Sequence, residues 1–273
     1  MPHPFRRILV NFETIKLEKA DHIATLTLNR PDRANSVNWK MMEELNVALD
    51  DAAQDESLRV LIITGAGEKA FCGGGDIADE DMYATFDMEK MRKWVRKTAC
   101  SITEKIRNMP IPTIAAINGI AVGGGFDWSC AADIRIGCER TRFMSAQIKT
   151  GLVPDSGACY LLPRIIRLDK ALEILYTGDW ITAEEAFNLG ILSKLVSAAE
   201  LENETRTLAE KIAQSPPIVT RFVKQLVYRG LDSDLPTALE MTAAMTAMTM
   251  FTKDHEEGVA AWQEKREPKY EGK

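Results

Sequence analysis

Three glycine-rich segments of the chain have acidic side chains beside them. They span residues 71–76 (Phe-Cys-Gly-Gly-Gly-Asp), 123–127 (Gly-Gly-Gly-Phe-Asp) and 151–157 (Gly-Leu-Val-Pro-Asp-Ser-Gly). Glycine has no Cβ, so its backbone N–H groups can approach a ligand closely. Two such turns that face each other could donate hydrogen bonds to an oxygen that becomes negative during a reaction. The segments therefore predict an oxyanion site, and the neighbouring carboxylates decide which chemistry follows.

The elements around these segments alternate between strands and helices. Short β-rich runs predict strands at residues 15–19, 22–28, 59–64, 113–118 and 133–137. Helical spacing of apolar residues predicts helices at residues 38–53, 88–107 and 127–131. Because strand, turn and helix recur at short intervals, we expect an α/β architecture with repeated crossovers.

The last quarter of the chain has a different pattern. No strand pattern follows Ala198, and helical spacing recurs at residues 201–214, 218–229, 236–250 and 253–266. We therefore expect an α/β core over residues 1–197 and an α-helical segment over residues 198–273.

Composition limits the function classes. The 273 residues carry a formal net charge of −6, which argues against a nucleic-acid surface because neutralising phosphates requires clustered Lys and Arg. No apolar run approaches the roughly 18 residues of a membrane span. The N-terminus lacks a signal-peptide pattern, and five cysteines without a CxxC pair suit a reducing compartment. We expect a cytoplasmic enzyme that acts on a small molecule, contacts neither nucleic acid nor membrane, and has no metal or redox cofactor.

Eight short motifs follow one another along nearly the whole chain. They lie at residues 28–36, 69–76, 115–125, 132–136, 151–154, 175–178, 183–186 and 254–266. Any one of them is a weak signal, but their order and spacing resemble those of the crotonase superfamily, also called the enoyl-CoA hydratase/isomerase family. The resemblance implies a spiral of ββα repeats that forms two roughly perpendicular sheets. It also implies C-terminal helices that form homotrimers, often paired into hexamers, and that cover the active site.

Members of this superfamily bind a coenzyme A thioester and stabilise its enolate with two backbone N–H groups. By position, those donors are Gly75 and Gly124, and coenzyme A is expected as part of the substrate. A helix that begins near Gly124 would also point its positive end at the enolate oxygen. Arg33 and Ala34, ahead of the first helix, and Gly73 resemble the segments that contact coenzyme A.

Three further residues lie near the expected substrate. Asp76 follows the first glycine turn, where capping of the following backbone is the favoured alternative to a substrate contact. Ile77 begins a stretch that could line the acyl pocket. Trp128 could flatten that pocket for a ring, with packing in the core as its alternative.

The proton chemistry depends on three side chains. Hydratases of this superfamily use two glutamates, and the resemblance places Asp127 and Gln147 at those positions. An amide has no useful protonation equilibrium, so Gln147 can only hold a water or a substrate oxygen. Asp155 stands where some superfamily members carry a third acid. It is the best candidate base, and a helix N-cap is its alternative role.

Three functions follow from this set. The leading hypothesis is an enoyl-CoA double-bond isomerase that uses Asp155 as base. The second is an enoyl-CoA hydratase, for a cyclic or dienoyl substrate among others, that uses Asp127 and Asp155 as its carboxylate pair. The third is a family member that binds acyl-CoA without turnover.

Overall fold

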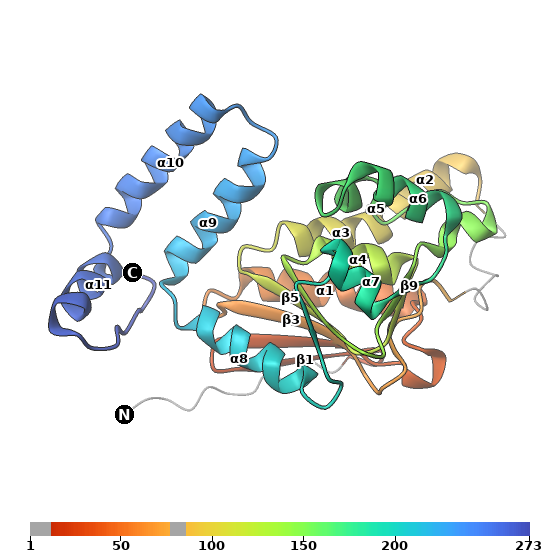
Figure 1. Ribbon diagram of the computed structural model, residues 1–273, viewed down its shortest axis with the longest axis horizontal. Coiled ribbons are helices and arrows are strands. Elements are labelled where there is room, and N and C mark those ends of the chain that lie inside the picture. The colour runs from red at the N-terminus through yellow and green to blue at the C-terminus, as the bar shows by residue number, and fades with distance from the viewer. Residues whose placement is uncertain (1–11, 77–85) are drawn as a thin grey trace.

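The computed structural model describes residues 12–76 and 86–273, which fold around two β-sheets (Figure 1). The larger sheet has the strand order β1-β2-β3-β5-β7-β10. These strands are β1 (Ile15–Ala20), β2 (Ile23–Leu28), β3 (Val60–Gly65), β5 (Thr113–Ile117), β7 (Ile134–Cys138) and β10 (Lys194–Val196). The smaller sheet has the order β4-β6-β8-β9, formed by β4 (Ala70–Cys72), β6 (Ile120–Val122), β8 (Arg142–Met144) and β9 (Ile181–Thr182).

Helices pack around these sheets, and the C-terminal helices extend away from them (Figure 1). The α-helices are α1 (Trp39–Gln54), α2 (Met88–Lys97), α3 (Ala99–Arg107), α4 (Gly124–Ala131), α5 (Ala158–Leu161), α6 (Leu168–Thr177), α7 (Ala183–Leu189), α8 (Leu201–Ala213), α9 (Pro217–Gly230), α10 (Leu235–Met250) and α11 (Lys253–Glu264). Among the described residues, the short 3-10 helices η1 (Pro31–Arg33), η3 (Ala146–Thr150) and η4 (Leu162–Arg164) lie in the connections. Within the described ranges, no helix combines the length and the apolar character that a membrane crossing requires.

Three consecutive pairs of strands share one arrangement. In β3-β4, β5-β6 and β7-β8, the first strand joins the larger sheet and the second joins the smaller sheet. The first strands pair in parallel, with Ile63 opposite Ala115 and Ala115 opposite Arg135, and β4, β6 and β8 are parallel as well. The predicted α/β class with ββα repeats, two sheets and C-terminal helices is confirmed.

Both faces of the larger sheet are covered. One face packs against the main core, in which Ile63 and Ala115 meet buried residues of α1, α3 and α4. On the other face Ile62 and Ile114 pack with Leu201 of α8. The predicted boundary at residue 198 precedes α8, which lies on the core sheet, whereas α9 and α10 extend away from it as an arm (Figure 1).

The helix predicted for residues 88–107 is interrupted at Thr98. Here the backbone leaves helical geometry, with φ −110° and ψ −91°, and the chain continues as α3. The Thr98 hydroxyl donates a hydrogen bond of 2.8 Å to the Trp94 carbonyl oxygen. A β-branched residue whose hydroxyl bonds the preceding turn competes with the helical pattern, and the apolar spacing did not reveal this.

A buried polar cluster fastens α9 to the core. The Asp133 carboxylate accepts a hydrogen bond of 2.7 Å from the Thr113 amide and another from the Tyr228 hydroxyl, and it forms a 2.9 Å ion pair with Lys224. Lys224 also donates to the Ile111 carbonyl oxygen at 3.1 Å. Burial lowers the pKa of Lys224, although the Asp133 carboxylate opposes that shift. The ammonium group therefore depends on Asp133 for compensation of its lost hydration.

We expect Asp133→Ala to lower the free energy of unfolding by about 3–5 kcal/mol, because it leaves a buried ammonium group unpaired. Urea titration followed by circular dichroism measures this change. Asp179→Ala is the matched control, because it breaks an ion pair of 3.3 Å with Lys149 in which both side chains are exposed. The control should lose less than about 1 kcal/mol. Equal losses in the two variants would contradict the fastening role of Asp133.

Candidate active site

The first two glycine-rich segments lie against each other. Strands β4 and β6 pair in parallel and lead directly into them. A Cβ placed on Gly125 would stand 2.5 Å from the Cys72 Cβ, and one placed on Gly74 would stand 2.9 Å from the Val122 carbonyl oxygen. Gly74 also has a φ of +87°, a backbone conformation that favours glycine. Glycine at these positions thus allows a backbone approach that any side chain would prevent.

Both predicted oxyanion donors have unengaged amide groups. Within the described part of the chain, neither the Gly75 N–H nor the Gly124 N–H donates a backbone hydrogen bond. Gly75 forms a bridge with Val37, and no atom of the described residues outside its chain neighbours lies within 4 Å of the place that a Cβ on Gly75 would take. Gly124 is the first residue of α4, where an amide has no partner within its own helix. The arrangement leaves two backbone donors for an anionic oxygen.

Gln147 and Asp155 lie together beside the second glycine turn. The Gln147 side chain is 9% exposed, and its amide carbon would be 3.7 Å from a Cβ on Gly123. Its Nε2 donates to Oδ1 of Asp155 at a distance of 3.5 Å. Asp155 is half-buried and also accepts a hydrogen bond of 3.0 Å from the Ser156 hydroxyl. The structure therefore brings the predicted base and the predicted amide together.

The alternative role of Asp155 as a helix cap is wrong. Helix α5 has Gly157 as its N-cap, with φ +107°, and no side chain makes the N-cap hydrogen bond. Asp155 stands two residues before that position. Asp127 instead accepts hydrogen bonds from the backbone amides at the start of α5, which is a contact between distant residues that no local pattern reveals.

Asp127 is fully buried under the turn between residues 155 and 158. Its Oδ2 accepts hydrogen bonds of 3.2 Å from the Ser156 amide and 3.3 Å from the Ala158 amide. Oδ1 has no hydrogen-bond partner within the described residues. Burial raises the pKa of Asp127 to about 7, with a further increase from the nearby Asp155 carboxylate, whereas the two amide hydrogen bonds oppose the shift. Protonation of Asp127 thus changes near neutral pH.

Ser156 belongs to the site but was not predicted from the sequence. The residue is 2% exposed, its hydroxyl donates to Asp155, and its Oγ would be 3.3 Å from a Cβ on Gly124. It therefore connects the predicted base with a predicted oxyanion donor. Its place in the Asp-Ser-Gly sequence is the only local signal for this role.

The segments predicted to contact coenzyme A meet at the first glycine turn. The Gly73 amide donates a hydrogen bond of 2.9 Å to the Ala34 carbonyl oxygen, and the Arg33 side chain is exposed beside it. Asp76 forms an ion pair of 2.9 Å with Arg30, which joins the loop before α1 to this turn. Ile77 lies outside the described residues.

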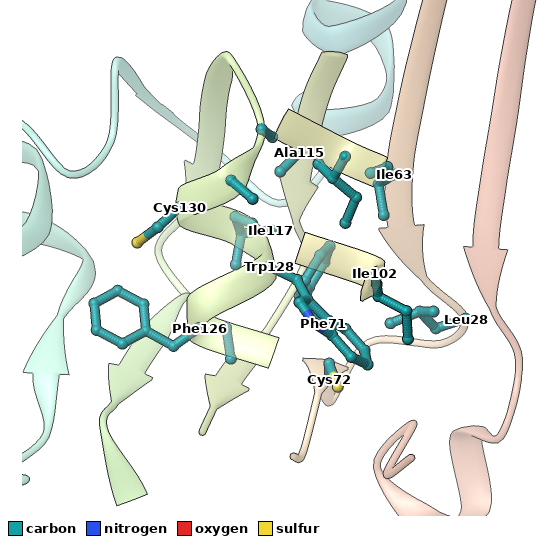
Figure 2. Packing of buried hydrophobic residues seen from close by; sticks show 14 of the residues in the cluster. Leu28, Ile63, Phe71, Cys72, Ile102, Ala115, Ile117, Phe126, Trp128 and Cys130 are labelled. Carbon is teal, nitrogen blue, oxygen red and sulfur yellow. The ribbon is translucent and has the colours of Figure 1, made fainter. Parts of the chain in front are cut away.

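Trp128 is part of the hydrophobic core. Its side chain is 4% exposed and lies among Phe71, Cys72 and Ile102 (Figure 2). Packing, which was the alternative role of this residue, therefore accounts for its contacts. A contact between Trp128 and the substrate remains a prediction.

Comparison with known proteins gives the same assignment for nearly the whole chain. The profile of the family described as Enoyl-CoA hydratase/isomerase matches residues 18–273. This chain belongs to that family. A crystal structure of enoyl-CoA hydratase from Bacillus anthracis is 37% identical and superimposes with a TM-score of 0.90, covering 96% of this chain and 100% of the other.

The curated relatives carry both kinds of name. A crotonyl-CoA hydratase of Syntrophomonas wolfei is 32% identical, over 95% of this chain and 98% of the relative. A 1,2-epoxyphenylacetyl-CoA isomerase of Escherichia coli is also 32% identical, over 92% and 95%. Membership of the enoyl-CoA hydratase/isomerase family is therefore established, whereas similarity alone does not choose between the two reactions.

A cavity of about 680 Å³ adjoins the turn that carries Asp155. Ser156 and Gly157 line it from that turn, and further lining residues come from α3, the end of α5, α9 and α10, among them Thr103, Tyr160 and Tyr228. For a member of the enoyl-CoA hydratase/isomerase family, a cavity that adjoins this turn is a suitable place for an acyl group.

We expect Gly74→Ala to lower the urea midpoint and to weaken binding of an acyl-CoA, measured by isothermal titration calorimetry. A left-handed backbone costs an alanine about 1–2 kcal/mol, and a Cβ at residue 74 would also collide with the Val122 carbonyl oxygen. Gly190→Ala is the control, because its φ is +85° but the space around it is open. The control should lose stability without losing affinity, and a similar loss of affinity in both would contradict the close approach.

Proposed function

We propose that this protein is an enoyl-CoA double-bond isomerase with Asp155 as its base. The observation that carries the proposal is the position of the half-buried Asp155 carboxylate, which meets Gln147 beside the glycine turn that presents the Gly124 amide. A 3-enoyl-CoA or a related thioester is the substrate class.

The reaction needs one carboxylate and two oxyanion donors. Asp155 removes a proton from the carbon next to the thioester carbonyl, and the electron pair of that C–H bond moves into a dienolate. The Gly75 and Gly124 amides donate hydrogen bonds to the enolate oxygen, and one such donor contributes about 2.7–4 kcal/mol to the transition state. The protonated Asp155 then returns the proton to the γ carbon, so that the double bond moves and no atom is gained or lost.

Coenzyme A enters this proposal as part of the substrate, and the protein needs no resident cofactor. Arg33, Ala34 and Gly73 are the proposed contacts, because they cluster at the turn that carries Gly75. The acyl group would extend from the oxyanion site into the cavity lined by Ser156 and Tyr160.

A hydratase is the second candidate, because Asp127 is also close to the turn and its raised pKa, about 7, suits a group that exchanges protons near neutral pH. In that reaction Asp127 and Asp155 would serve as the carboxylate pair. Gln147 would orient the attacking water.

We further propose that the chain forms a homotrimer, or a hexamer of two trimers, through its C-terminal helices. Helix α9 exposes 52% of Val223 and 55% of Val227, while Phe251 after α10 is 93% exposed. Such an accumulation of exposed apolar side chains marks an interaction surface.

All five cysteines are unpaired, which supports the proposed cytoplasmic location.

We expect Asp155→Asn to abolish deuterium incorporation at the α and γ carbons of a 3-enoyl-CoA in heavy water. An amide cannot accept the substrate proton, so the rate should fall by roughly 100-fold or more. NMR spectroscopy of the thioester measures the incorporation. Asp179→Asn is the control, because it makes the same change at an exposed carboxylate that does not line the cavity.

The outcomes separate the three hypotheses. Undiminished incorporation in Asp155→Asn would contradict the isomerase mechanism. A product heavier by one water from crotonyl-CoA would identify a hydratase, since isomerisation leaves the mass unchanged. Tight binding of acyl-CoA to the unaltered protein without either reaction would identify a binding protein without turnover.

We expect the double substitution Val223→Asp and Val227→Asp to convert the oligomer into a monomer, because two carboxylates would have to lose their hydration in the interface. Light scattering after size-exclusion chromatography measures the mass. Val47→Asp on α1 is the control, because Val47 is 57% exposed and lies outside the C-terminal helices. A trimeric or hexameric double variant would show that these two valines lie outside the interface.

A further inference from the structure

The turn that carries Asp155 has buried backbone amides that need acceptors. Asp127 Oδ2 accepts from the Ser156 amide at 3.2 Å and from the Ala158 amide at 3.3 Å. Gly157 lies between them with a φ of +107°, so the chain reverses here without a regular helical pattern to satisfy these donors. A buried amide without an acceptor loses the free energy of a hydrogen bond. The Asp127 carboxylate therefore supports this turn directly.

The same turn is held from α3. The Thr103 hydroxyl donates a hydrogen bond of 2.5 Å to the Ser156 carbonyl oxygen, and the Cys100 thiol donates one of 3.3 Å to the Asp155 carbonyl oxygen. Ser156 then donates its own hydroxyl to Oδ1 of Asp155 at 3.0 Å. The path from Asp127 to the Asp155 carboxylate thus runs through the backbone and the side chain of one residue, Ser156.

We propose that Asp127 is a positioning residue, which acts through Ser156 to hold the Asp155 carboxylate at the reacting carbons. This inference rests on the proposed role of Asp155 as base. It assigns Asp127 a different role from that of a second proton-transferring group, which the hydratase mechanism would require.

The hydrogen bonds from the Ser156 and Ala158 amides do not require Asp127 to be ionised. The amides of Ser156 and Ala158 require only an acceptor oxygen, which a carboxylate, a neutral carboxyl group and a carboxamide all have. The ionisable groups that face Asp127 are Asp155, Cys130 on its own helix and Cys159 on α5. None of them is a cation, so no neighbouring charge favours the ionised form of Asp127.

Asparagine and alanine at residue 127 give opposite expectations. Asp127→Asn keeps an acceptor of the same shape, and its kcat for isomerisation should stay within about threefold of the unaltered protein. Asp127→Ala leaves both amides without an acceptor, and displacement of Asp155 by about 1 Å should lower kcat roughly 100-fold while KM changes little. Ser156→Ala, which removes the hydroxyl contact, should lower kcat in the same way.

Hydrogen exchange of the peptide that spans residues 154–160, measured by mass spectrometry, reports the contact without any reaction. Its amides should exchange faster in Asp127→Ala and at an unchanged rate in Asp127→Asn. Asp254→Ala is the matched control. Asp254 is 4% exposed and accepts from the Glu271 and Gly272 amides at 2.7 and 2.9 Å, remote in sequence from Asp155. It should lose stability without faster exchange of this peptide.

Each outcome supports or overturns the inference. If Asp127→Asn is as inactive as Asp127→Ala while the amides of residues 154–160 stay protected from exchange, Asp127 transfers a proton. That result would overturn the inference. Faster exchange in Asp127→Ala with unchanged kcat would also overturn it, because the contact would then serve stability alone. If Asp127→Ala does not fold, the kcat values of Asp127→Asn and Ser156→Ala still test the inference. Failure of the proposed function is recognised separately, by full activity of Asp155→Asn.

Discussion

The close approach of two backbones, without room for a side chain between them, is the constraint on which the site depends. Strands β4 and β6 pair in parallel, and Gly125 then lies so near Cys72 that a Cβ would collide with it. The same approach brings the turn of Gly75 to the start of α4. The positions of both proposed oxyanion donors therefore follow from how the smaller sheet is built, and the ββα repeat supplies one strand of that sheet each time.

The acidic side chains near the two glycine turns, Asp127 and Asp155, have different environments. Asp155 is half-buried and meets the polar groups of Gln147 and Ser156, whereas Asp127 is fully buried and meets backbone amides. Desolvation affects the second far more strongly, which is why its pKa is raised to about 7. Two chemically identical carboxylates beside the same turn can therefore have different tasks.

Sequence patterns predicted the fold well, because the repeating strands and glycine turns are local signals. Family spacing placed Asp155 and Gln147 in one site, whereas the alternative role of Asp155 as an N-cap is wrong. Asp155 has the local sequence of an N-cap, yet Asp127, which is distant in sequence, accepts the amides of that turn. The break at Thr98 accompanies a side-chain hydrogen bond to the preceding turn, about which apolar spacing contains no information. The burial of Trp128 depends on packing against residues of other elements.

The burial of Asp127 limits how this active site can evolve. A glutamate at this position would add one methylene to a place with no solvent-exposed surface, and overpacking of that kind typically costs about 1–3 kcal/mol. It would also push the carboxylate into the backbone that carries Asp155. A two-glutamate arrangement would therefore require changes in the turn above residue 127 as well as at residue 127 itself, since the larger side chain alone would destabilise that turn.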